Sequence, residues 1–165
     1  MKARRYTGTK DGVAKQRRAG MVAFIDNVIM LGGGALWNNG DFVVRNMRGK
    51  DALSVHATGR AVDVSWRYLP DKGLGVKVDG RQRAINVMRT LVNNADVLGV
   101  ELILDYFPSP HGRGWRCDRR AWIRYDVPTM QGAPNGDWFH CELEPAFADD
   151  AKRVNDAFAS IKAVP

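Results

Sequence analysis

The chain has 165 residues, of which 45% are hydrophobic and 26% are charged, as in an ordinary globular protein. This length accommodates one domain with a core of its own and argues against a second full domain. Most of the formal charge of +7 belongs to residues 1–20, which contain seven Lys or Arg and one acid, Asp11.

The predicted elements follow the spacing of apolar residues along the chain. Apolar side chains that recur every three or four residues indicate helices, alternating ones indicate strands, and clusters of Gly and Pro indicate turns. In chain order these patterns predict a helix over 13–31, strands over 41–47 and 60–66, a loop over 68–80, a helix over 81–95, a strand over 101–106, a turn over 108–114, a strand over 115–125, an irregular region over 126–136, a strand over 138–143 and a helix over 147–164. Because helices and strands do not alternate regularly, we expect a single-domain α+β fold with a mostly antiparallel sheet packed by helices.

Two of the predicted strands carry polar residues on one face. In the strand 60–66, Asp63 shares a face with small residues, and the opposite face is apolar. In the strand 138–143, His140 shares a face with Trp138 and Glu142, away from the more apolar side. Both strands therefore offer a polar side chain to a site outside the core.

His56, Asp63 and His140 together supply the donor set of catalytic zinc. Two imidazoles and one carboxylate can hold the ion and leave a fourth position for water, whose pKa then falls to about 7. Each residue taken singly is more often structural. However, the pattern Ser-x-His-x-x-Gly-x-Ala-x-Asp at 54–63 specifies five residue types within ten positions. The sequence therefore predicts a metallohydrolase with zinc as its cofactor.

These motifs resemble those of the zinc-dependent D-alanyl-D-alanine carboxypeptidase-like peptidases, a family that includes phage endolysins cutting the L-alanyl-D-glutamate bond of peptidoglycan. Residues 54–63, Ser-Val-His-Ala-Thr-Gly-Arg-Ala-Val-Asp, look like the first metal motif of that family. Residues 137–140, Asp-Trp-Phe-His, look like the second. The resemblance spans roughly residues 41–143 and implies one zinc peptidase domain over 1–165 with a hedgehog/DD-peptidase-like fold.

The resemblance also implies roles for residues around the ion. Asp137 matches the acid that serves the family as catalytic base, although the family usually has Glu at that position. Glu142, on the same strand face as His140, is the substitute if Asp137 cannot reach. Arg45 is similar in placement to an upstream arginine that the family uses on the substrate carbonyl, and its alternative is a solvent-facing strand arginine.

Three further residues are candidates for supporting or substrate-binding roles. Ser54 is expected to support the metal loop or to orient a ligand by a hydrogen bond. Trp138 is expected to form a wall of the cleft. His111 lies in a turn-rich loop that could overhang the cleft, but an exposed loop histidine is the favoured interpretation.

The expected function is that of a phage-type endolysin acting on the stem peptides of bacterial peptidoglycan. The L-alanyl-D-glutamate bond is the favoured target, and a D-alanyl-D-alanine carboxypeptidase and a non-catalytic wall-binding module are the alternatives. No secretory signal is visible, so we expect synthesis in the cytoplasm of a host bacterium, release to the wall and no membrane insertion. The basic segment 1–20 would attract anionic wall polymers or aid solubility, and no specific nucleic-acid motif is present.

The two cysteines offer a different enzyme class. Cys117 and Cys141 lack the Cys-x-x-Cys spacing of zinc or redox sites and are interpreted as buried thiols. A Cys-His hydrolase is disfavoured because strand alternation directs Cys141 away from His140. Cys117 lies at no evident helix start that would lower its pKa.

Overall fold

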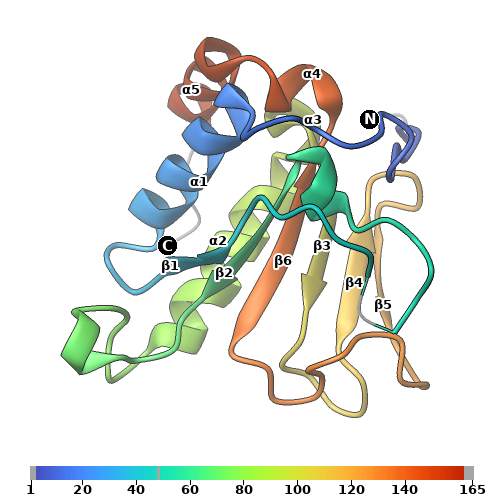
Figure 1. Cartoon of the computed structure of the whole chain (residues 1–165). Coiled ribbons are helices and arrows are strands. Elements are labelled where there is room, and N and C mark those ends of the chain that lie inside the picture. The colour runs from blue at the N-terminus through green and yellow to red at the C-terminus, as the bar shows by residue number, and fades with distance from the viewer. Residues whose placement is uncertain (1–2, 48, 162–165) are drawn as a thin grey trace.

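The structure, a computed structural model of the chain, describes residues 3–47 and 49–161 (Figure 1). Within these residues, six strands form one sheet in the order β1-β2-β6-β3-β4-β5, and every neighbouring pair is antiparallel. The elements in chain order are α1 (Ala19–Leu31), β1 (Trp37–Gly40), the 3-10 helix η1 (Val55–Thr58), β2 (Ala61–Ser65), the 3-10 helix η2 (Pro70–Lys72), α2 (Gly80–Asn93), α3 (Ala95–Leu98), β3 (Val100–Asp105), β4 (Arg113–Arg116), β5 (Ala121–Arg124), β6 (Trp138–Leu143), α4 (Pro145–Ala148) and α5 (Ala151–Ser160). Helices pack against the antiparallel sheet, which confirms the predicted α+β fold.

The hydrophobic core lies between the helices and one face of the sheet. Strand β2 contributes Val62 and Val64 to the core, and β6 contributes Phe139 and Cys141. Helices α1, α2 and α5 supply the apolar side chains that cover them. Because side chains alternate along a strand, the residues between these point to the opposite face. The sheet thus separates a helix-covered face from a second face that is free to carry a site.

The strands of the candidate site lie where the sequence predicts them. Strand β6 has the predicted bounds, and β2 lies inside the predicted range 60–66. Helix α2 and strand β3 also begin within one residue of their predicted starts at 81 and 101. In each case the alternation or helical spacing of apolar residues is enough to predict the element, because the segment has one apolar and one polar face.

The strand predicted over residues 41–47 is wrong. The adjacent segment β1 occupies this edge of the sheet instead, and the chain leaves the sheet after β1 ends. Val43 and Val44 are exposed, so their side chains add nothing to the core. β-branched residues favour strands only where a pleated, half-buried surface receives them, and no neighbouring strand offers one here.

The first and last helices are shorter than predicted. Helix α1 begins at Ala19 rather than at residue 13. The helix predicted over 147–164 is divided into α4 and α5, and Asp150 caps α5 by accepting a hydrogen bond from the backbone N–H of Arg153 at 2.9 Å. Residues 162–164 of that prediction lie outside the described residues. No helix in the described part of the chain is both long enough and apolar enough to cross a lipid bilayer.

Residues 115–125, predicted as one strand, form most of a hairpin instead. Strands β4 and β5 pair with each other, and β4 begins inside the predicted turn 108–114. The hairpin turn contains Arg120 with a left-handed φ of 54°. Such turns usually carry Gly, Asn or Asp at that conformation, so the arginine concealed the turn from sequence reasoning.

Residues 3–18, which we call the N-terminal strap, are tied to the body of the fold by ion pairs. Arg4 pairs with Asp96 at 3.1 Å and with Glu144 at 2.5 Å. Arg18 pairs with Asp149 at 2.7 Å, and Asp11 pairs with Arg60 at 2.8 Å. Part of the positive charge at this end of the sequence is therefore balanced within the molecule.

Candidate metal centre

His56 is delivered to the site by the short helix η1. Gly59 ends this helix with a left-handed φ of 69°, which glycine adopts without the steric cost of a side chain. The turn leads directly into β2, so that His56 and Asp63 come from consecutive elements. His56 is 5% exposed, and its Nδ1 is hydrogen-bonded to the backbone carbonyl of Asp41.

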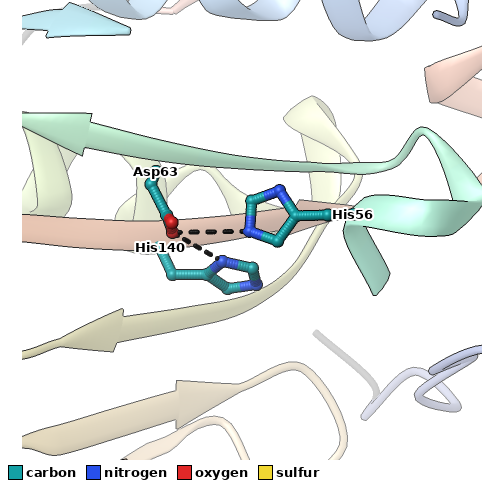
Figure 2. A group of neighbouring side chains, drawn as sticks. All are labelled: His56, Asp63 and His140. Atoms are coloured by element: carbon teal, nitrogen blue, oxygen red, sulfur yellow. Dashed lines mark hydrogen bonds and ion pairs between the residues drawn. The ribbon is translucent and has the colours of Figure 1, made fainter. Parts of the chain in front are cut away.

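Asp63 and His140 face each other across neighbouring strands. The two residues are direct partners in the β2–β6 ladder, which places their side chains on the same face of the sheet. His140 Nδ1 lies 3.0 Å from Asp63 Oδ1, and His56 Nε2 lies 3.5 Å from the same oxygen. Figure 2 shows the rings of His56 and His140 both directed at the tip of this carboxylate.

The three side chains can hold a metal ion. One donor atom from each lies within 4.8 Å of the other two. Donor atoms about 2.0–2.1 Å from a tetrahedral zinc ion lie roughly 3.3 Å apart, which is close to the 3.0 and 3.5 Å that separate the histidine donors from Asp63, and the two histidine donors lie within 4.8 Å of each other. The prediction that His56, Asp63 and His140 come together is confirmed.

Each imidazole has an oxygen acceptor behind it. The carbonyl of Asp41 requires His56 Nδ1 to be the protonated nitrogen, which leaves the lone pair on Nε2 toward Asp63. Glu142 Oε1 lies 3.0 Å from His140 Nε2 and leaves Nδ1 for the centre. Metal-binding histidines commonly have such a partner on the second nitrogen, which sets the tautomer and the ring orientation. The arrangement is therefore that of two oriented donors.

The buried charges at the centre shift the pKa values of its groups. Burial alone lowers the pKa of His140, but hydrogen bonds to Asp63 and Glu142 outweigh it and raise the pKa to about 10. Burial alone raises the pKa of Asp63, but hydrogen bonds to His140 and His56 hold it well below its usual range. Without a metal ion, His140 is thus positively charged at neutral pH, with a proton on both ring nitrogens. A cation that binds to Nδ1 displaces the proton there.

Asp137, the predicted base, is bound to an arginine. Its two carboxylate oxygens accept hydrogen bonds from Arg67 at 2.6 and 2.7 Å. Its backbone carbonyl accepts from Ser65 and Trp66, which continues the pairing of β2 with β6. Within the described residues, no hydrogen bond or ion pair joins Asp137 to the three metal-binding candidates. Its assignment as the base stays a prediction.

Arg45 and Ser54 lie on the segment that leads to η1. Arg45 is exposed, and its guanidinium donates to the carbonyl of Asn46 at 3.2 Å. The backbone N–H of Ser54 donates to the carbonyl of Arg45 at 3.1 Å, and the carbonyl of Ser54 accepts from Ala57 at 3.0 Å. Ser54 therefore anchors the start of η1 through its backbone, and a role for its hydroxyl stays a prediction.

Trp138 and Tyr106 form an aromatic pair beside the centre. Their ring centroids are 4.8 Å apart with an interplanar angle of 30°. Burial raises the pKa of Tyr106, and the nearby carboxylates of Asp63 and Glu142 raise it further. Tyr106 was missed by sequence reasoning, although strand alternation through β3 places it on the same face as His140.

The remaining candidates lie apart from the centre. His111 is in the turn between β3 and β4, and no hydrogen bond or ion pair links it to the other histidines within residues 3–47 and 49–161. Cys117 and Cys141 are both buried and free. Burial raises the pKa of Cys117 to about 11 and the pKa of Cys141 well above its ordinary value. Neither thiol has the environment of a nucleophile.

Two partners of the centre carry no signal in the sequence. The carbonyl of Asp41 is a backbone atom, which every residue has, so composition cannot indicate it. Tyr6, whose hydroxyl reaches Glu142, is separated from it by 136 positions along the chain.

Comparisons with family models, curated proteins and solved structures find no match to the chain.

Proposed function

We propose that the protein is a zinc-dependent peptidase that hydrolyses a peptide bond in the stem peptides of bacterial peptidoglycan. The observation that carries the proposal is the convergence of His56, Asp63 and His140 on one point, with an oxygen acceptor behind each ring. The resemblance of residues 54–63 and 137–140 to the metal motifs of wall peptidases supports the substrate class. The favoured bond joins L-alanine to D-glutamate, as in phage-type endolysins.

The donor set suits hydrolysis because it leaves room for further ligands. Zinc held by two histidines and one carboxylate supplies Lewis acidity to a carbonyl and to water, whose pKa falls to about 7. Asp63 lowers the net positive charge of the centre, while His56 and His140 bind as neutral donors. Tyr106 and Trp138 form an aromatic surface against which a peptide substrate can be held.

A general base is needed to take a proton from the attacking water. Both oxygens of the Glu142 carboxylate are already engaged, one by His140 and the other by Tyr6. The side chains of Asp137 and Arg67 are 32% and 44% exposed. The pair is bidentate, which strengthens it, but both side chains are open to solvent, so water can replace Arg67 at Asp137. Asp137 is therefore easier to free for a water molecule than Glu142, and we favour it as the base.

Arg45 is the proposed group for the oxyanion that develops during hydrolysis. A fixed positive charge is most effective where negative charge appears in the transition state. Arg45 lies on the same segment as Asp41, whose carbonyl orients His56. Its charge also acts on Tyr106, whose pKa it lowers against the larger effects of burial and of Asp63 and Glu142. Arg45 is thus within electrostatic range of Tyr106.

The wall is proposed as the place of action, after synthesis in the bacterial cytoplasm. Arg5, Lys10 and Lys15 in the strap make no ion pair within the described residues, and they are the groups that would contact anionic wall polymers. Exposed charges of this kind act mainly on the rate of encounter and are weakened by salt.

Metal analysis and digestion of peptidoglycan test the proposal together. The purified protein is expected to contain one zinc ion per chain, which binds through the three donors, and to lose activity to a chelator. Mass spectrometry of digested peptidoglycan is expected to show new termini at L-alanine and D-glutamate. Release of single D-alanine residues would instead identify a carboxypeptidase.

His140→Ala and Asp63→Asn are expected to abolish both zinc binding and cleavage. The matched control is Asp156→Asn, which removes an exposed acid that pairs with Lys152 on α5. It is expected to behave as the unmodified protein. A protein that binds peptidoglycan but cleaves nothing, with or without added zinc, would contradict the proposed activity and favour a wall-binding module.

A further inference from the structure

We infer that the N-terminal strap is a working part of the metal centre, in which Tyr6 positions His140 through Glu142. The inference rests on the proposed binding of zinc by His56, Asp63 and His140. Tyr6 is a positioning residue, because it acts on the centre through another side chain and touches neither the metal donors nor a substrate.

The connection is a chain of two hydrogen bonds. The Tyr6 hydroxyl donates to Glu142 Oε2 at 2.8 Å. Glu142 Oε1 lies 3.0 Å from His140 Nε2, the nitrogen that faces away from Asp63. Glu142 is 4% exposed and His140 7% exposed, so water has little access to replace either contact. The two carboxylate oxygens therefore have one partner each, and together these define the rotation of the carboxylate.

The ring of Tyr6 is itself held from several directions. The next residue, Thr7, donates to Glu101 Oε1 from its backbone N–H at 3.2 Å and from its hydroxyl at 2.6 Å. The guanidinium of Arg116 lies 4.9 Å from the centroid of the Tyr6 ring. Arg60, which is fully buried, donates to the carbonyl of Gly8. Such anchoring leaves the hydroxyl little freedom to turn away from Glu142.

Loss of this hydroxyl would leave one oxygen of a buried carboxylate without a partner. A buried unsatisfied acceptor is unfavourable, so Glu142 would rotate or admit water to recover a hydrogen bond. Either change loosens the acceptor on His140 Nε2. The ring would then be less well oriented toward the ion, and groups that orient metal-binding histidines typically change metal affinity by about 10- to 100-fold.

Zinc titration of the full-length chain tests the role of Tyr6. The metal is removed with a chelator, and zinc affinity is measured by competition with a chromophoric chelator. Tyr6→Phe keeps the ring and removes the hydroxyl, and we expect zinc to bind roughly 3- to 10-fold more weakly, less than for a direct partner. Glu142→Gln is expected to weaken binding by about 10- to 100-fold. Tyr68→Phe, in an exposed loop, is the matched control and is expected to bind as the unmodified protein does.

A second measurement reports on His140 directly. In zinc-loaded protein, ¹⁵N NMR of the ring is expected to show a protonated Nε2 that is protected from exchange with solvent. Tyr6→Phe is expected to speed this exchange, whereas Tyr68→Phe is not. Circular dichroism of the metal-free variants checks folding. If Tyr6→Phe does not fold, Glu142→Asp, whose shorter side chain cannot reach both partners, is expected to weaken zinc binding about tenfold.

The outcomes separate this inference from the proposed function. If the unmodified protein binds zinc and Tyr6→Phe binds it equally well with unchanged exchange at His140, the strap has no part in the centre. Unchanged affinity in Glu142→Asp would overturn the inference in the same way. If the unmodified protein does not bind zinc, the proposed function fails first, and the inference fails with it.

Discussion

At His56 and His140, one ring nitrogen is held by an oxygen of the protein and the other faces the carboxylate of Asp63. This two-sided arrangement distinguishes the site from a chance meeting of polar residues. A buried histidine that is only structural needs a single acceptor to satisfy its neutral form. Here, when a cation is bound, one nitrogen of each ring donates to an oxygen of the protein and the other binds the cation.

Asp137→Asn tests the general base at the level of one residue. The substitution removes the proton acceptor but leaves the three metal donors in place. We expect kcat to fall by about 10²- to 10⁴-fold while zinc content stays at one ion per chain. Steady-state cleavage of a stem-peptide substrate and metal analysis of the same sample measure the two effects. Retention of the full kcat would show that Asp137 is not the base.

The cysteines provide a prediction about pH. Because burial raises the pKa of Cys117 to about 11, its reactive thiolate is scarce at neutral pH and becomes abundant only as the pH rises toward 11. We expect iodoacetamide at pH 7–8 to leave the folded protein unmodified and its peptidase activity unchanged. Labelling in denaturant, followed by mass spectrometry, is the positive control. Rapid inactivation at pH 7 would revive the Cys-His alternative.

At the scale of elements, the site depends on how η1, β2 and β6 meet. Gly59 lets the chain turn from η1 into β2 within two residues, and the β2–β6 ladder aligns Asp63 with His140. Sequence reasoning placed both strands and their polar faces, because alternation is a local property. It failed at residues 41–47, where β-branched residues lie in a segment that pairs with none of the six described strands.

Helix α5 allows stability and metal binding to be separated. Asp150 accepts a hydrogen bond from the backbone N–H of Arg153 and caps this helix, which packs against α1 and contributes Val154 and Ala157 to the core. Asp150→Ala is expected to lower the free energy of unfolding by about 1 kcal/mol, since an N-cap acceptor is lost. Zinc affinity is expected to stay the same. Urea unfolding and zinc titration provide the two readings.

A change of zinc affinity in Asp150→Ala would mean that α5 is coupled to the metal centre. Asp156→Ala is the control on the same helix, because it removes an exposed acid that makes no cap. It is expected to change the free energy of unfolding less than Asp150→Ala.

At the scale of the whole molecule, the start of the chain closes over strands from its middle and end. Arg60 is fully buried and pairs with Asp11 of the strap at 2.8 Å and with Glu101 of β3 at 3.3 Å. Its guanidinium also donates to the carbonyls of Gly8 and Leu143. This one side chain thus joins the strap to β3 and to the end of β6, close to Glu142.

Arg60→Met tests this connection. The substitution leaves the buried carboxylate of Glu101 without its cation, which typically costs about 3–5 kcal/mol of folding free energy. Chemical unfolding followed by circular dichroism measures the change. Lys152→Met removes an exposed ion pair with Asp156 and is expected to cost less than about 1 kcal/mol. Equal effects of the two substitutions would refute a central role for Arg60.

The sequence by itself determined the donor types and the faces on which they lie. His56, Asp63 and His140 are recognisable because imidazole and carboxylate are the ligands that zinc requires, and because alternation in two short strands is encoded residue by residue. Only the tertiary structure decided that Asp63 pairs with His140, 77 positions away, and that Tyr6 supports them through Glu142. Strand register and the docking of the strap depend on packing between distant segments, and no local pattern records which segments will meet.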